Sequence, residues 1–128
     1  MAADLAIVFS SSDLDKGSRD RTGVFPVLSV VSSARRVSVD QLLLPNRAPA
    51  SVALARQIAM YLTHVALGRN FTQVARLFGR DRTTAAHACQ IIEDLRDEPS
   101  FDLQMHCLEV ALLAQAKVWG QVGGRAVQ

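Results

Sequence analysis

The chain has 128 residues, of which 49% are hydrophobic and 20% are charged, and its formal net charge is +2. This length and composition indicate a single globular domain with a sizeable apolar core. No apolar run approaches the roughly 18 residues that a membrane span needs, and the first residues lack the basic start of a signal peptide, so we expect a cytoplasmic protein.

Positive charge is concentrated in the middle of the chain. Residues 35–82 carry eight arginines and only two aspartates, while the segments on either side have a net negative charge. The planar guanidinium of arginine suits phosphates and guanine edges better than the ammonium of lysine does. The cluster is typical of a nucleic-acid-binding surface, and an ordinary solvated surface would explain it equally well.

The N-terminal part is expected to change from a tail to a helix near residue 23. Residues 1–22 are rich in serine and aspartate, which predicts a flexible tail, and a domain over residues 23–119 follows. Pro26 suits the first turn of a helix, and apolar residues continue the pattern to residue 34. We therefore expect the first helix to begin at Pro26.

Two more helices are expected between residues 38 and 68. Ser38 can cap a short helix that Pro45 stops, and a basic loop with Arg47 follows. Ser51 can cap a long helix with apolar residues at every third or fourth position, and Gly68 ends it. The spacing is helical throughout, without the alternation of period two that indicates strands.

The next segment has the pattern of a helix-turn-helix. Thr72 can cap a short helix closed by Gly79, and Asp81 can cap a second helix. In this motif the first turn of the second helix enters the major groove of DNA and touches base edges. The residues placed in or near that turn are Arg80, Asp81, Arg82, Thr83, Thr84 and, one turn later, His87.

The last predicted helix, over residues 101–119, has two apolar faces. One face can close the core and carries Phe101, Met105, Leu108, Leu112 and Trp119. The second face carries Leu103, Val110 and Leu113 and suggests a contact beyond the core, so the candidate partner-binding residues are these three and Trp119. The alternative is a terminal helix that is buried all round. Residues 120–128 contain three glycines and are expected to form a flexible tail.

Three segments of the chain form a recognisable series: residues 55–62 (ARQIAMYL), 78–84 (FGRDRTT) and 87–89 (HAC). Their order and spacing resemble the C-terminal DNA-binding domain, domain IV, of the bacterial replication initiator DnaA. The resemblance extends over residues 24–97. It implies an all-α helical bundle that contains a helix-turn-helix and takes double-stranded DNA as its partner.

The resemblance also implies roles for individual residues. Arg56 and Gln57 would grip phosphates at the start of the long helix, and His64 would add a basic phosphate contact. Arg47 would enter the minor groove from the basic loop. The base-reading turn would hold Asp81, Arg82, Thr83 and Thr84, with His87 close to the DNA.

The chain departs from the family pattern in several places. Arg82 stands where the family usually has histidine, and Gly79 stands where the family commonly has two glycines. Because arginine can contact guanine through two hydrogen bonds, we expect an altered base preference. The sequence has no Gly-x-x-x-x-Gly-Lys-Ser/Thr loop, so we expect neither nucleotide binding nor ATPase activity.

Catalytic and metal sites are not expected. His64, His87 and His106 lack the spacing of metal ligands, and His87 and Cys89 point to different faces of a helix. Neighbouring side chains in a helix diverge, which also argues against a catalytic pair of His106 and Cys107. The two cysteines form no disulfide pattern. We therefore expect no enzyme activity, no metal and no cofactor.

Three functions fit these observations. The first is a sequence-specific, nucleoid-associated regulator of transcription, similar to alphaproteobacterial activators of gene transfer agent genes. It would act with a sigma-like factor, with RNA polymerase or as a homodimer. The second is a replication regulator that competes for the boxes bound by the initiator. The third is an interaction adaptor that has lost DNA binding and works through its last helix.

Overall fold

The computed structural model describes the backbone of residues 16–44 and 48–127, and the side chains of residues 23–44 and 48–115. The regular structure within these ranges is helical, so the predicted all-α class is confirmed. The helices are α2 (Lys16–Arg35), α3 (Val39–Leu43), α4 (Ala50–Val65), α5 (Phe71–Phe78), α6 (Arg82–Leu95) and α7 (Pro99–Val127).

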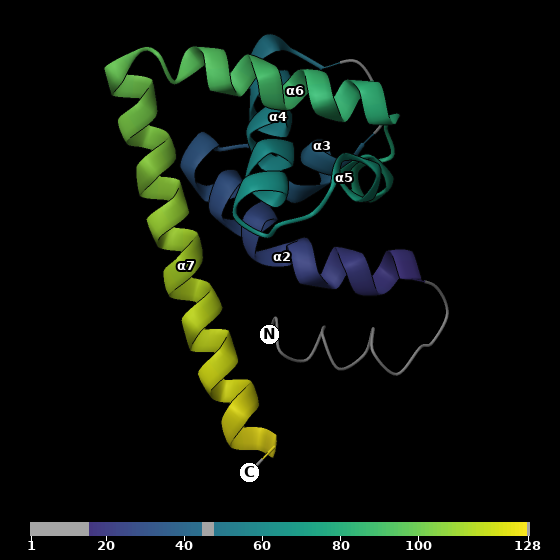
Figure 1. The fold of residues 1–128 in the computed structure, drawn as a ribbon, viewed down its shortest axis with the longest axis vertical. Helices are drawn as coiled ribbons and strands as arrows, with labels where there is room; N and C mark the ends of the chain where they lie inside the picture. Colours follow the sequence, from purple (N-terminus) through teal and green to yellow (C-terminus); the bar gives the residue numbers. More distant parts are fainter. Residues whose placement is uncertain (1–15, 45–47, 128) are drawn as a thin grey trace.

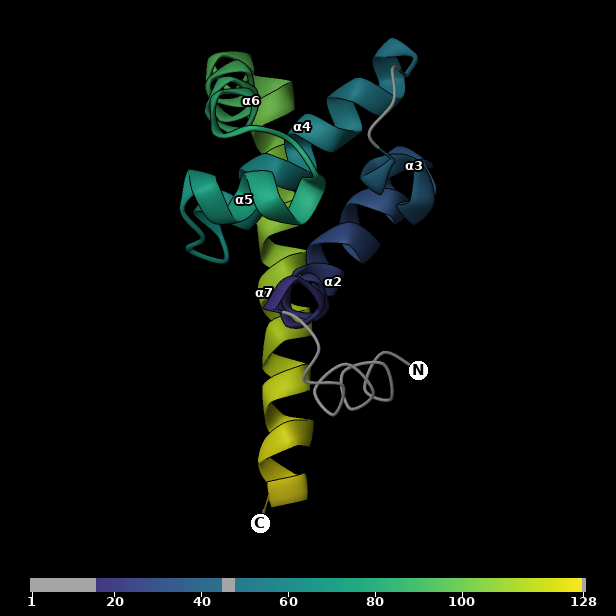
Figure 2. The same ribbon diagram turned by 90° about the vertical axis from the view of Figure 1, so that its right-hand side faces the viewer.

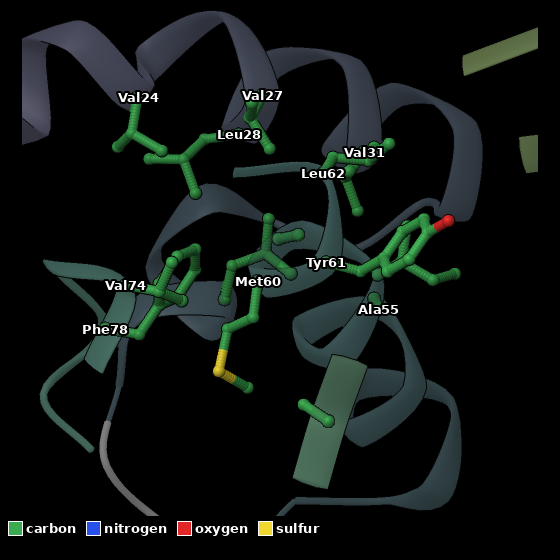
Figure 3. Close-up of a cluster of buried hydrophobic side chains, with 14 of the residues drawn as sticks. Val24, Val27, Leu28, Val31, Ala55, Met60, Tyr61, Leu62, Val74 and Phe78 are labelled. Atoms are coloured by element: carbon green, nitrogen blue, oxygen red, sulfur yellow. The ribbon is translucent and has the colours of Figure 1, made fainter. Parts of the chain in front are cut away.

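Helix α4 lies at the centre of the bundle. It contacts α2, α3, α5 and α6, and in Figure 1 α6 crosses it at the top of the view while α2 lies below. All residues from 58 to 63 are buried, as expected for a helix with neighbours on several sides. Figure 3 shows side chains of α2 and α5 directed toward Met60 and Leu62 of this helix.

Helix α2 begins earlier than the sequence suggested. It starts at Lys16 rather than at Pro26, and Pro26 lies inside it. The apolar stripe that packs on the bundle already includes Val24, which is 1% exposed, so burial favours helical backbone before the proline. A proline inside a helix removes one backbone hydrogen bond and bends the axis. Figure 2 accordingly shows the first part of α2 end-on and its later part running obliquely.

Two of the predicted helix caps are wrong. The N-cap of α4 is Pro49 rather than Ser51, and the N-cap of α5 is Asn70 rather than Thr72. Asn70 forms a capping box, in which its side chain accepts from the Gln73 amide at 2.8 Å and the Gln73 side chain accepts from the Asn70 amide at 2.9 Å. This reciprocal pair satisfies two backbone donors, which Thr72 alone would not do.

The predicted cap of α3 is confirmed. The Ser38 hydroxyl accepts from the Gln41 amide at 3.1 Å, and the Gln41 side chain accepts from the Ser38 amide at 3.1 Å. The predicted end of α4 is displaced by a few residues, because the helix ends at Val65 and Gly68 follows with a positive φ of 70°. The cap signal thus locates the start of α3, whereas α4 and α5 each begin two residues before the start that their predicted caps imply.

A cluster of hydrogen bonds centred on Arg96 attaches α7 to the bundle. Arg96 donates to Asp102 at 2.6 Å and to Glu109 at 2.9 Å, both in α7, and to the Tyr61 hydroxyl of α4 at 3.1 Å. Burial opposes the charge of Arg96, but the hydrogen bonds to Glu109, Asp102 and Tyr61 outweigh it and raise its pKa. This cluster fixes the sharp turn between α6 and α7.

The two predicted faces of the last helix are confirmed for the described side chains. Met105, Leu108 and Leu112 are buried, and α7 packs on α2. The exposed fractions on the other face are 62% for Leu103, 52% for Val110 and 58% for Leu113. The side chain of Trp119 lies outside the described residues. The backbone of α7 stays helical to Val127, beyond the expected end at Trp119, because glycine lowers helix propensity without barring it.

Candidate nucleic-acid interface

The turn between α5 and α6 forms as the sequence predicts. Gly79 adopts the left-handed conformation (φ 65°) that closes α5, and the amide of Arg80 donates back to the Ala75 carbonyl at 2.9 Å. Asp81 caps α6 and accepts from the Thr84 amide at 2.7 Å. This backbone hydrogen bond, with a second from the Thr84 side chain, lowers the pKa of Asp81. The carboxylate therefore stays charged and holds the first turn of α6 in place.

Helix α6 has an apolar face and, at its beginning, a polar face on the opposite side. Ala85, Ala88 and Ile92 are buried against the bundle. On the opposite side, the exposed residues are Asp81, Arg82, Thr83, Thr84 and His87. The residues predicted to read base edges thus share one surface, and the small alanines bring the backbone of α6 close to α4.

A hollow of about 280 Å³ lies beside this turn. It brings together side chains from α4, from α6 and from the turn before α6. The predicted DNA-binding residues that line it are Arg56, Gln57, Arg80, Thr84 and His87. Five residues that are up to 31 positions apart in the sequence therefore meet at one site.

Arg56 is more buried than a simple phosphate contact would be. Its side chain is 6% exposed, and its Nε donates to the Gln41 carbonyl at 2.9 Å, which ties α4 to α3. Burial, and then the positive charge of Arg80, lower the pKa of Arg56. An anion in the hollow would relieve the repulsion between the two guanidinium groups. Arg56 therefore has a structural contact in addition to its predicted role.

Arg80 links the turn to another part of the chain. Its Nη2 donates to the Leu44 carbonyl at 3.2 Å, next to the loop that precedes α4. Arg47, the predicted minor-groove residue, belongs to that loop and lies outside the described residues. The contact nevertheless places the end of α3 beside the helix-turn-helix.

His64 does not line the hollow. Its Nδ1 hydrogen-bonds to the Arg69 carbonyl at 2.7 Å, and its ring stacks on Phe71 with 4.3 Å between the centroids. The guanidinium of Arg82 lies 5.9 Å from the centroid of the same Phe71 ring. The sequence patterns predict no role for Phe71, because its place directly after the cap depends on Asn70 rather than Thr72 being the cap of α5.

Charge changes sign along α6. Its beginning is flanked by Arg80 and Arg82, whereas exposed carboxylates occupy its end and the following turn at Glu93, Asp94, Asp97 and Glu98. A polyanion would be attracted to the first end and repelled by the second. The beginning of α6 is therefore the end suited to a nucleic-acid backbone.

Other kinds of site find no support in the part of the chain that is described. Within it, no three His, Cys, Asp or Glu side chains are placed to hold a metal ion, and no helix is long and apolar enough to cross a membrane. Cys89 is buried in α6, and Cys107 is exposed on α7.

Residues 24–92, which include the turn and the hollow, match the family described as "Bacterial dnaA protein helix-turn-helix". The chain belongs to this family. The predicted resemblance to DnaA domain IV is thereby confirmed, and α5 and α6 are the helices of a DnaA-type DNA-binding helix-turn-helix.

Similar proteins include bacterial replication initiators. The chain is 40% identical over 73 residues to the chromosomal replication initiator protein DnaA of Bifidobacterium animalis subsp. lactis, and 38% identical over 80 residues to that of Mesorhizobium japonicum. The aligned regions cover 56% and 62% of this chain. They cover only 12% and 16% of the two initiators, so the likeness concerns the DnaA-type domain alone.

Proposed function

We propose that the protein is a sequence-specific, duplex-DNA-binding regulator of transcription that acts in the cytoplasm by binding rather than by catalysis. The main support is the first turn of α6, which exposes Arg82 and Thr83 beside the hollow lined by Arg56 and Arg80. Cationic groups for phosphates and polar groups for base edges thus share one surface.

In this mechanism the two kinds of contact have separate tasks. The arginines and Gln57 bind phosphates and fix the orientation of the domain on the duplex. The residues after Asp81 then enter the major groove, where each base pair has its own pattern of donors and acceptors. Because each neutralised phosphate releases counterions, affinity should fall steeply as salt rises, with a slope of about −0.9 per phosphate.

Activation of transcription by recruitment needs a second contact, which we assign to the exposed face of α7. Leu103, Val110 and Leu113 form an apolar row there. A sigma-like factor or RNA polymerase is the partner that would convert DNA binding into activation, as in activators of gene transfer agent genes. A second copy of the chain is the alternative partner, and it would double the DNA interface.

Fluorescence anisotropy tests the DNA-binding step. The full chain is titrated into two labelled duplexes, one with the box bound by the initiator and one scrambled, at several salt concentrations. We expect salt-sensitive binding to both duplexes, with the specific site still to be selected. A chain that binds neither duplex at low salt would contradict the proposal.

A pair of variants ties that binding to the helix-turn-helix. Thr83→Ala removes an exposed hydroxyl from the first turn of α6 and should weaken binding to the selected site by about fivefold or more, as the loss of a base contact does. Ser33→Ala removes an exposed hydroxyl from α2 and should leave affinity unchanged. Equal affinity of both variants would exclude Thr83 from the contacts to base edges.

Two observations support other functions. The 40% identity to a replication initiator favours a regulator that competes for initiator boxes, and a clear preference for the box duplex would select that function. The exposed face of α7 favours an interaction adaptor. That function would be selected if the chain bound no duplex and the Leu113→Asp variant lost a protein partner.

A further inference from the structure

Arg82 is the first residue of α6 and has an aromatic neighbour in the preceding helix. Its guanidinium carbon lies 5.9 Å from the ring centroid of Phe71, which is the first residue of α5. This distance falls within the range of a cation–π contact, in which the face of the ring attracts the positive charge. The two helices of the motif thus meet through these two side chains as well as through their turn.

Phe71 is itself fixed in position by the core and by His64. It is partly buried against the hydrophobic core, and its ring stacks on His64 with a centroid distance of 4.3 Å and an interplanar angle of 26°. The His64 ring is fixed in turn by its hydrogen bond to the Arg69 carbonyl at 2.7 Å. The ring under Arg82 is therefore part of the folded framework and not a loose surface group.

A fixed ring changes what Arg82 can do. An exposed arginine samples many rotamers, and part of any contact energy is lost when a partner immobilises it. A guanidinium that already rests on a ring loses less freedom on binding. The first position of the second helix is also where this motif contacts base edges in the major groove. Arginine at that position matches the paired O6 and N7 acceptors of guanine.

We propose, resting on the proposed DNA-binding function, that Arg82 reads a guanine in the major groove and that Phe71 is a positioning residue that sets this preference. His64 supports the Phe71 ring and takes part through it. The chain should accordingly select a duplex in which one guanine depends on Arg82.

The first test identifies that guanine. The full chain selects duplexes from a random library, and dissociation constants are then measured for the selected site and for its single base-pair variants. In the wild type, replacing the guanine should weaken binding by about 5- to 150-fold. Arg82→Gln should shift the preference at this base pair toward adenine, because the glutamine amide pairs with the N6 and N7 atoms of adenine.

The second test isolates the ring. Phe71→Leu keeps an apolar side chain on the core but removes the ring, and it should reduce discrimination at the same base pair by about two- to fivefold. Other base pairs should keep their discrimination, and Phe71→Tyr should retain the wild-type preference. In an Arg82→Ala background, Phe71→Leu should have no effect on affinity. Phe101→Leu, which alters another partly buried aromatic on α7, is the matched control and should change no preference.

The outcomes separate this inference from the proposed function. If the chain binds no duplex, both fall. If it selects a site without a guanine that depends on Arg82, DNA binding stands and the reading role of Arg82 is overturned. If Phe71→Leu weakens binding equally at every base pair, or equally in the Arg82→Ala background, Phe71 serves the fold alone and its positioning role is overturned.

Discussion

Arginine occurs at both ends of α6, and its surroundings differ completely between them. At the beginning, Arg82 is exposed beside an aromatic ring, whereas just past the end Arg96 is enclosed by two carboxylates of α7. A ring attracts a guanidinium without neutralising it, so the charge at the beginning still acts on an external anion. Carboxylates neutralise it, so the charge at the end stabilises a helix junction. The neighbours of each arginine, more than its presence, separate a binding role from a structural one.

The largest effect on stability is expected from substitution of Arg96, just past the end of α6. Arg96→Ala leaves Asp102, Glu109 and the Tyr61 hydroxyl without their shared donor. Because the cluster is only partly buried, we expect a loss of about 2 kcal/mol in the free energy of unfolding rather than the larger cost of a fully buried pair. Urea denaturation measures this loss, and the DNA affinity of the folded variant should stay unchanged.

Arg35→Ala is the matched control for that prediction. Arg35 also reaches α7, but through a single hydrogen bond to Gln104 at 3.2 Å. We expect a change of less than about 0.5 kcal/mol, as for most surface substitutions. Equal destabilisation by the two variants would show that the carboxylates around Arg96 add nothing.

The next largest effect is expected on the salt dependence of DNA affinity, from substitution of Arg80 beside the beginning of α6. Arg80→Ala removes one of the two guanidinium groups that line the hollow, so the plot of log affinity against log salt should become less steep by about 0.9. Anisotropy at four or five salt concentrations measures the slope. Arg35→Ala removes an equal charge on the side of α7 and should leave the slope as it is. An unchanged slope in Arg80→Ala would remove Arg80 from the phosphate contacts.

A smaller effect is expected on the stability of the fold at acid pH, through the Asp81 cap of α6. The hydrogen bond from the Thr84 amide lowers the pKa of Asp81 in the folded state, so the cap stabilises the fold above the ordinary carboxylate pKa of about 3.9. That stability is lost as the pH falls through the lowered value. Asp81→Asn keeps a capping side chain without the charge, so its melting temperature should fall less between pH 5 and pH 2. Asp97→Asn, which changes an exposed carboxylate in the turn after α6, is the control and should follow the wild type. An identical acid response of the wild type and both variants would contradict the prediction.

The smallest effect is expected on the outer face of α7. Leu113→Asp alters a side chain that is 58% exposed and should change the free energy of unfolding by less than about 0.5 kcal/mol, with DNA affinity intact. Leu112→Asp alters the adjacent residue, which is 1% exposed, and should unfold the domain. Comparable unfolding by both substitutions would mean that this face of α7 belongs to the core.

The features that the sequence predicted correctly are local ones. Gly79 and Asp81 define the turn because each acts on backbone groups within five residues. The two faces of α7 follow from helical spacing alone, which assigns Leu112 inward and Leu113 outward. Such signals need no knowledge of the rest of the fold.

The features that the sequence did not predict depend on distant contacts. Arg56 is buried because its guanidinium reaches Gln41, 15 positions earlier, and the Arg96 cluster joins residues that are 6, 13 and 35 positions away. Helix α2 is continuous across Pro26 because Val24 packs on the bundle, which outweighs the preference of proline for the first turn of a helix. Tertiary packing decides each of these cases, and no local pattern contains it.

The burial of Cys89 on the inner side of α6 should make its thiol react much more slowly than that of Cys107. Burial raises the pKa of this thiol to about 11, whereas Cys107 is exposed on α7. Because thiolates are the species that react with alkylating reagents, a maleimide at neutral pH attaches to Cys107 first. Modification of Cys89 requires an opening of the fold that exposes its thiol, so we expect a second, slower phase of labelling whose rate reports on such openings. A duplex that grips the beginning of α6 should lengthen that phase.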